Sequence, residues 1–145
     1  MSPERRADWS LEADMRVARG HKLDAHIPQV FLDSPISHTG AALATILGFV
    51  WGLTLGRGKV THEKGLWIFT RMPGWAFGRG GICIGSCYFT RSTVSPAVLG
   101  HERVHREQWR RYGLLFPLLY ALAGRDPLRN RFEIEAGLKA GGYAR

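Results

Sequence analysis

Residues 95–112, SPAVLGHERVHREQWRRY, decide the fold of this chain. They predict a helix, because Ser95 can cap the free N–H groups and Pro96 suits the first helical position. Gly113 can then supply the left-handed conformation that often ends a helix. The helix also has an apolar face to bury, formed by Val98, Leu99, Trp109 and Tyr112. We therefore expect the rest of the chain to pack around this helix.

His101, Glu102 and His105 form the pattern H-E-x-x-H within this helix. At 3.6 residues per turn the two histidines lie on one face, where both imidazoles can bind one metal ion. Glu102 is offset around the helix by one residue, so its carboxylate can reach a water on that ion. Zinc hydrolases use this arrangement, because zinc lowers the pKa of the water to about 7 and the carboxylate accepts its proton. The alternative is a basic amphipathic helix with two surface histidines, in which Glu102 pairs with Arg106.

A second helix is predicted further along the chain, in residues 130–142, NRFEIEAGLKAGG. It can begin at Asn130 or at Asp126, and the glycine pair at 141–142 can end it. Between the two helices, residues 113–124, GLLFPLLYALAG, predict a short apolar helix that covers the site and returns the chain.

A tetrahedral zinc site with one open position needs a third protein ligand. Glu133 is the favoured candidate, because it shares a helical face with the small residues Ala136 and Ala140, which let two helices approach closely. Glu135 is the alternative, on a face that it shares with the bulkier Leu138. The side chain of Glu133 could instead fold back onto the residue that caps its own helix.

HERVH followed by a separate helical FEIEA resembles the gluzincin class of zinc metallopeptidases, in which two motif histidines and a distal glutamate bind zinc. In the membrane-embedded prenyl-protein endopeptidases of that class, the ligand glutamate lies in the pattern E-x-x-A-D. Glu133 stands three residues before Ala136, and Gly137 occupies the place of the aspartate. The segments FGRGG, HERVHREQWRRYG and NRFEIEAG are also similar to a group of short, uncharacterised bacterial proteins.

The chain has 145 residues, of which 45% are hydrophobic, so it can form a single ordered domain with a buried core. We divide it into a polar N-terminal segment, residues 1–28, and one zincin-like domain, residues 29–145. The N-terminal segment lacks the apolar stretch of a secretory signal. Cys83 and Cys87 lie four steps apart in a predicted strand, about 13 Å, which is too far for a disulfide. The absence of a disulfide framework favours the cytoplasm.

The net charge of +8 suits an anionic membrane surface, an acidic partner or nucleic acid. Glutamates among the arginines of the motif helix argue against nucleic acid. Residues 40–55, GAALATILGFVWGLTL, carry no charge and predict a helix buried behind the metal-binding helix. Such a helix is about 24 Å long, shorter than the ~30 Å hydrocarbon core of a membrane. Because Arg57 and Lys59 follow it, peripheral membrane contact through residues 40–56 is the alternative.

Residues 66–70 and 82–90 are rich in isoleucine and aromatic residues and are bounded by glycine or proline, so they predict a β-hairpin. In zincins an edge strand lies beside the cleft and binds an extended substrate. The resemblance therefore implies this role for residues 82–90.

These patterns together predict an α+β protein with a minimal zincin-like fold, a β-hairpin plus packed helices that carry the metal site. The predicted function is zinc-dependent hydrolysis of a peptide or protein substrate. His101, His105 and Glu133 would bind Zn²⁺, and Glu102 would act as general base. Tyr112 could stabilise the oxyanion, or simply pack in the core. The alternative function is a non-catalytic, zinc-stabilised domain whose basic face binds a partner or a membrane surface.

Overall fold

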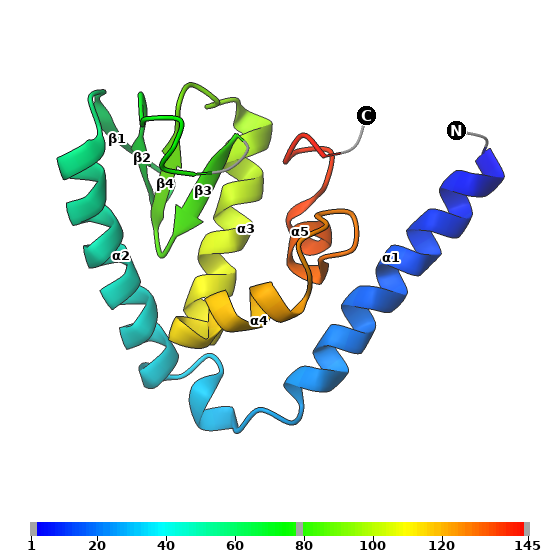
Figure 1. Ribbon diagram of the computed structural model, residues 1–145. Helices are drawn as coiled ribbons and strands as arrows, with labels where there is room; N and C mark the ends of the chain where they lie inside the picture. The colour runs from blue at the N-terminus through cyan, green and yellow to red at the C-terminus, as the bar shows by residue number, and fades with distance from the viewer. Residues whose placement is uncertain (1–2, 78–79, 144–145) are drawn as a thin grey trace.

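The structure is a computed structural model that describes residues 3–77 and 80–143 (Figure 1). Within these residues it is a mixed α+β protein, so the predicted fold class is confirmed at that level. The helices are α1 (Pro3–Asp24), α2 (Pro35–Leu55), α3 (Pro96–Tyr112), α4 (Phe116–Leu122) and α5 (Arg131–Ala136), with the 3-10 helices η1 (Gln29–Phe31) and η2 (Gly113–Leu115). The strands are β1 (Val60–Glu63), β2 (Leu66–Phe69), β3 (Gly81–Ile84) and β4 (Cys87–Thr90), in the sheet order β1-β2-β4-β3.

The sheet lies between α2 and α3 (Figure 1). Successive side chains of a strand point to opposite faces, so a central strand can serve both helices. In β4, Tyr88 belongs to an apolar cluster with Leu99 of α3, and its neighbour Phe89 packs edge-on against Trp51 of α2. All four residues of β4 are buried as a result. Side chains of the motif helix therefore pack against a central strand that is covered on both faces.

The predicted hairpin between residues 66–70 and 82–90 is wrong. Residues 82–90 fall in two strands, β3 and β4, which form their own antiparallel hairpin through a turn at Gly85, where φ is +60°. Strand β2 pairs in parallel with β4 and forms a second hairpin with β1. Cys83 and Cys87 consequently lie on adjacent strands, and both are free thiols. The apolar run concealed this turn, because a single glycine was its only local signal.

Helix α2 begins at Ser34, whose side chain forms a capping box with Ser37. Its buried face consists of small residues, Ser37, Gly40, Ala41, Ala44, Gly48 and Gly52. This face packs closely, since a Cβ atom at Gly52 would lie 2.4 Å from the ring of Phe69. The opposite face is exposed. The prediction that the helix is buried thus holds for its inner face and is wrong for its outer face.

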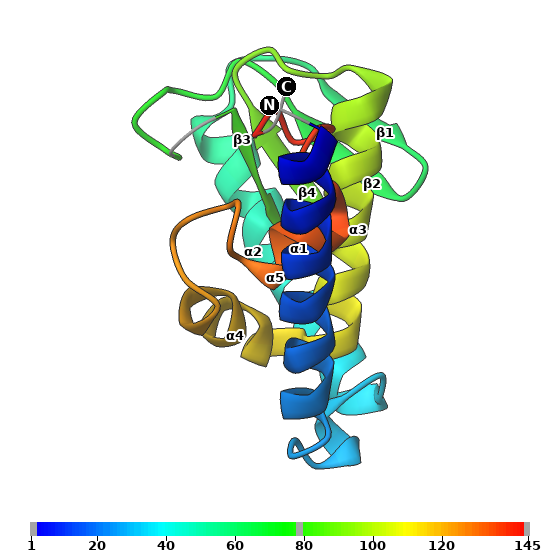
Figure 2. The same cartoon turned by 90° about the vertical axis from the view of Figure 1, so that its right-hand side faces the viewer.

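Helix α1 continues through Gly20 to Asp24. Gly20 packs against α5, because a Cβ atom there would lie 2.0 Å from Arg131 Cδ. The Arg131 guanidinium donates two hydrogen bonds to the buried Asp24, of 3.0 and 2.7 Å. Tyr112 donates a third, of 2.6 Å. This network joins α1 to α3 and α5, and Figure 2 shows α1 running along α5.

Helix α5 is shorter than predicted. It begins after Asn130, whose side chain accepts a hydrogen bond from the N–H of Phe132, so Asn130 rather than Asp126 is the cap. It ends at Ala136 instead of at residues 141–142, because the backbone turns at Gly137 with a φ of +94°. The Asn130 amide also donates to carbonyls at the end of α4, which fixes α5 relative to α4.

Candidate metal centre

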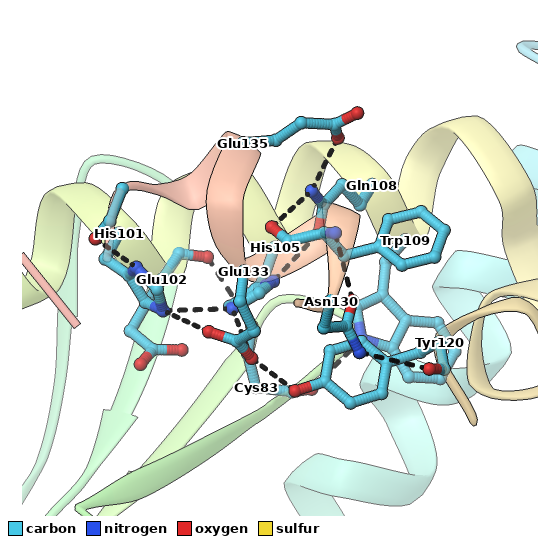
Figure 3. A network of polar contacts seen from close by, with 12 residues as sticks. Cys83, His101, Glu102, His105, Gln108, Trp109, Tyr120, Asn130, Glu133 and Glu135 are labelled. Carbon is cyan, nitrogen blue, oxygen red and sulfur yellow. Dashed lines mark hydrogen bonds and ion pairs between the residues drawn. The ribbon is translucent and has the colours of Figure 1, made fainter. Parts of the chain in front are cut away.

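His101 and His105 of α3 meet Glu133 of α5 in the interior of the protein (Figure 3). All three side chains are buried, and their ligand atoms lie within 4.8 Å of one another. Glu135, the alternative third ligand, points elsewhere, because its Oε2 accepts a hydrogen bond of 3.0 Å from Gln108. The structure thus brings together the two motif histidines and the favoured glutamate.

The spacing of the three side chains fits one small cation. The two Nε2 atoms of His101 and His105 are 3.1 Å apart, and Glu133 oxygens lie 3.2 and 3.5 Å from them. Atoms bound tetrahedrally to zinc at about 2.0–2.1 Å are roughly 3.3–3.4 Å from one another. Glu133 Oε2 is buried and lacks an aligned hydrogen bond among the described residues. The donor set and its unsatisfied oxygen therefore suit Zn²⁺.

The hydrogen-bond partners of the Nδ1 atoms indicate which nitrogen of each imidazole could face a metal ion. Nδ1 of His101 lies 3.2 Å from the carbonyl oxygen of Gly137, and Nδ1 of His105 lies 2.8 Å from Gln108 Oε1. Both partners can only accept, so in a neutral imidazole Nδ1 carries the proton and Nε2 is the nitrogen that could bind a metal. Gln108 donates its own N–H groups to a carbonyl of α5 and to Glu135, which sets its orientation.

Gly137, which stands where the E-x-x-A-D pattern has its aspartate, provides a partner for His101 through its backbone. Its backbone carbonyl, instead of a carboxylate, accepts the hydrogen bond from His101. The carbonyl is presented by the turn that ends α5, where a positive φ favours glycine. Metal-bound histidines normally have such an outer partner, so the departure from the pattern leaves the site supported.

Glu102 is buried in the wall of the same cleft. Its Oε2 has no hydrogen-bond partner among the residues that the structure describes. Burial raises the pKa of Glu102, and the nearby histidines only partly oppose this effect, so the pKa stays above its usual value. A carboxylate with a raised pKa and an unused oxygen is suited to accept a proton.

Tyr120 of α4 is a site residue that the sequence analysis missed. Its hydroxyl donates a hydrogen bond to Glu133 Oε1. Burial and the Glu133 carboxylate both raise the pKa of Tyr120, so the phenol stays protonated. Burial alone would raise the pKa of Glu133, but contacts from His101 and His105 and the bond from Tyr120 outweigh it and leave Glu133 ionised. In the sequence, Tyr120 is one aromatic residue in an apolar run.

Tyr112, which was considered for oxyanion stabilisation, is instead a core residue. Its side chain is buried, and its hydroxyl donates to Asp24 in the network that joins α1 to α5. Burial raises the pKa of Tyr112 to about 12, and Asp24 contributes to the rise. Tyr112 therefore packs in the core and does not serve as an oxyanion donor.

The chain matches no protein-family model, no curated protein and no solved structure. The chemistry of the site is therefore argued from its own atoms. Two imidazoles and one carboxylate can hold a divalent cation, and a separate carboxylate beside them can accept a proton.

A cleft of about 880 Å³ opens over these residues, within the usual range for ligand sites. Residues 81–84 of β3 form one wall, and Phe116, Pro117 and Tyr120 line another part. Strand β3 is the last strand of the sheet and pairs only with β4 among the described strands. One of its edges is therefore open, as the sequence analysis expected of a strand within residues 82–90.

Replacement of Tyr120 with phenylalanine is expected to weaken zinc binding by about 10- to 100-fold, because it removes the outer hydrogen bond to Glu133. Competition with a chelator of known zinc affinity would measure the change. Tyr112→Phe is the matched control, since it removes a buried hydroxyl that contacts Asp24 and not the site. Equal zinc affinities for Tyr120→Phe and the unmodified protein would contradict this role.

Proposed function

We propose that this protein is a zinc-dependent hydrolase, specifically a metallopeptidase. The observation that carries the proposal is the buried cluster of His101, His105 and Glu133, whose donor atoms have the mutual spacing of zinc ligands. When bound, zinc supplies a Lewis acid that acidifies a water molecule and polarises a substrate carbonyl.

Glu102 has the role of general base in this proposal. Its carboxylate accepts a proton from the attacking water and can pass that proton to the leaving amine. The position of Glu102 in the cleft wall and its unpaired Oε2 support this role. Tyr120 and Gln108 act as positioning residues, because each holds a ligand side chain by a hydrogen bond.

An extended peptide is the substrate class that best suits the cleft. Strand β3 has no strand partner on its outer edge, so backbone groups there can pair with an extended chain, apart from the Cys83 carbonyl, which accepts a hydrogen bond of 3.0 Å from Trp109. Next to this edge, Phe116 and Pro117 offer an apolar surface for a substrate side chain. A peptide held in this way would cross the cleft beside His101 and Glu102, which line it.

The test of the proposal begins with zinc. Purified protein is expected to contain stoichiometric zinc by elemental analysis, and His105→Ala and Glu133→Gln are expected to lose it. Glu135→Gln is the matched control and should retain zinc, because a glutamine there can still accept the hydrogen bond from Gln108. Loss of zinc from Glu135→Gln but not from Glu133→Gln would overturn the ligand assignment.

The second step is activity. The zinc-loaded protein should cleave members of a fluorogenic peptide library, and a chelator should abolish the cleavage. Stoichiometric zinc with no cleavage of any peptide or protein substrate would favour the non-catalytic, zinc-stabilised domain instead.

A further inference from the structure

The outward side of α2 has no part in the proposed function, although it is strongly apolar. Six large apolar side chains on it are 48–69% exposed, namely Ile36, Leu43, Ile46, Leu47, Val50 and Leu53. They recur every three, four or seven residues, so they form one stripe along the helix. We call this stripe the α2 outer face. In Figure 1, α2 stands at the edge of the molecule.

The apolar surface extends from α2 onto the neighbouring 3-10 helix η2. Leu114 is 61% exposed and lines a shallow groove together with Ile36 and Leu43. Monomeric soluble proteins rarely expose contiguous apolar patches of more than a few hundred Å². A surface of this kind is therefore expected to bind something in the working protein.

The threonine hydroxyls of α2 have partners within the helix, and its exposed ionisable side chain, His38, lies in the first turn. No Asp, Glu, Lys or Arg lies between Pro35 and Gly56. The exposed hydroxyls of Thr39 and Thr54 donate to helix carbonyls at 2.7 and 2.9 Å. Threonines inside membranes make the same bonds, because they leave no hydroxyl without a partner in an apolar medium. The outer face can therefore enter lipid at little cost.

The positive charge next to α2 indicates what kind of apolar partner the outer face binds. Arg57 and Lys59 follow α2 directly, and both are exposed. The whole chain has a net charge of +8, so its attraction is to anionic surfaces. A pair of α2 helices from two copies would lack the flanking charge pairs that usually fix the register of such contacts. An anionic lipid surface matches both the apolar stripe and the basic residues at its end.

The orientation of α2 follows from its packing. It is long and apolar enough to cross a membrane by composition, and it is the single such helix among the described residues. Its inner face, however, packs against a sheet whose outer strand β1 has an open edge. Open sheet edges do not occur in the hydrocarbon region, because their backbone groups would lack partners there. The helix must then lie along the membrane surface.

We propose that the α2 outer face binds the surface of an anionic lipid membrane as an interfacial helix, with Arg57 and Lys59 among the headgroups. The contact is independent of the metal centre, because the outer face contains none of the residues of the cleft. It would keep the protein at a membrane while its cleft remains available.

Vesicle flotation tests the proposal on the purified 145-residue chain, whatever its zinc content. The protein should float with phosphatidylcholine vesicles that contain phosphatidylserine, and the triple variant Ile46→Gln, Leu47→Gln, Val50→Gln should stay at the bottom. The control triple variant Leu11→Gln, Met15→Gln, Leu23→Gln changes apolar side chains of similar exposure on α1 and should float normally. Zinc content and thermal unfolding of each variant show that the fold and the metal centre are intact.

A separate double variant tests the contribution of Arg57 and Lys59 to membrane binding. Arg57→Gln with Lys59→Gln should weaken partition into the anionic vesicles by about tenfold or more. Arg19→Gln with Lys22→Gln, which removes two exposed charges from α1, should have a much smaller effect.

Two results would overturn the proposal. One is wild-type protein that remains unbound at low salt with every vesicle composition. The other is a dimer in light scattering that becomes a monomer in the α2 triple variant, which would assign the face to a second copy of the chain. Neither result depends on zinc content, so failure here is distinguishable from failure of the proposed hydrolase.

Discussion

Replacement of Glu102 with glutamine is expected to lower peptide hydrolysis by about 10²- to 10⁴-fold, the usual contribution of a general base. The amide cannot accept a proton, although it has nearly the same shape as the carboxylate. Zinc should stay bound, because His101, His105 and Glu133 are unchanged. The measurement is kcat/KM on a peptide that the wild-type protein cleaves, with zinc content determined on the same samples.

The matched control is Glu107→Gln on the same helix. Glu107 is exposed and pairs with Arg106 and Arg110 at the surface, so its loss should leave hydrolysis unchanged. A zinc-loaded Glu102→Gln variant with wild-type activity would refute the assignment of the base.

The largest expected effect on stability comes from Arg131→Met. Breaking a buried ion pair by removing one partner costs about 3–5 kcal/mol, because the other charge stays buried and uncompensated. Here the remaining charge would be Asp24, which is buried and has both oxygens bound to Arg131. Urea unfolding followed by circular dichroism would measure the loss in the free energy of unfolding. A loss of less than about 1 kcal/mol would show that the pair resembles a surface salt bridge.

Two further variants check that the loss of stability comes from the buried charge of Asp24. Arg129→Met removes an exposed arginine that pairs with Asp126, and it should change the free energy of unfolding by less than about 1 kcal/mol. Asp24→Asn together with Arg131→Met should recover part of the loss, since no charge then stays buried alone.

The hydrogen-bond network around Asp24 also makes the stability of the protein depend on pH. Burial alone raises the pKa of Asp24, but hydrogen bonds from Arg131 and Tyr112 outweigh it and leave the pKa lowered. A lowered pKa in the folded state means that ionised Asp24 stabilises the fold above its unfolded pKa of about 3.9. This contribution is lost as the pH falls below that value toward the folded pKa. In Asp24→Asn, the part of the acid sensitivity that comes from this residue should disappear.

Local signals in the sequence predicted a large part of this molecule. Ser95, Pro96 and Gly113 define the ends of α3 as expected, because caps and exits depend on residues that are neighbours in the chain. Of the two glutamates considered as a third ligand, Glu133 is the one that lies beside His101 and His105. The helical face used to choose it is shorter than expected, because Ala140 lies beyond the end of α5, and Ala136 is the small residue of that face that α5 contains.

The parts that the sequence did not predict depend on contacts between distant segments. The parallel pairing of β2 with β4 is a long-range contact, and nothing in either strand specifies its partner. Tyr120 reaches Glu133 because α4 lies against α5, an arrangement to which the Asn130 amide contributes by donating to carbonyls at the end of α4. The exposed side of α2 could not be predicted either, since an uncharged apolar helix has the same sequence pattern whether one face or both faces are buried.

The bond from His101 to Gly137 has a consequence for how this site can change over generations. A codon change can delete a carboxylate in one step, but every amino acid carries a main-chain oxygen. The partner of His101 therefore depends on the backbone conformation at residue 137, which glycine adopts without strain. A sequence search for an acidic residue after Glu133 would therefore overlook this partner of His101.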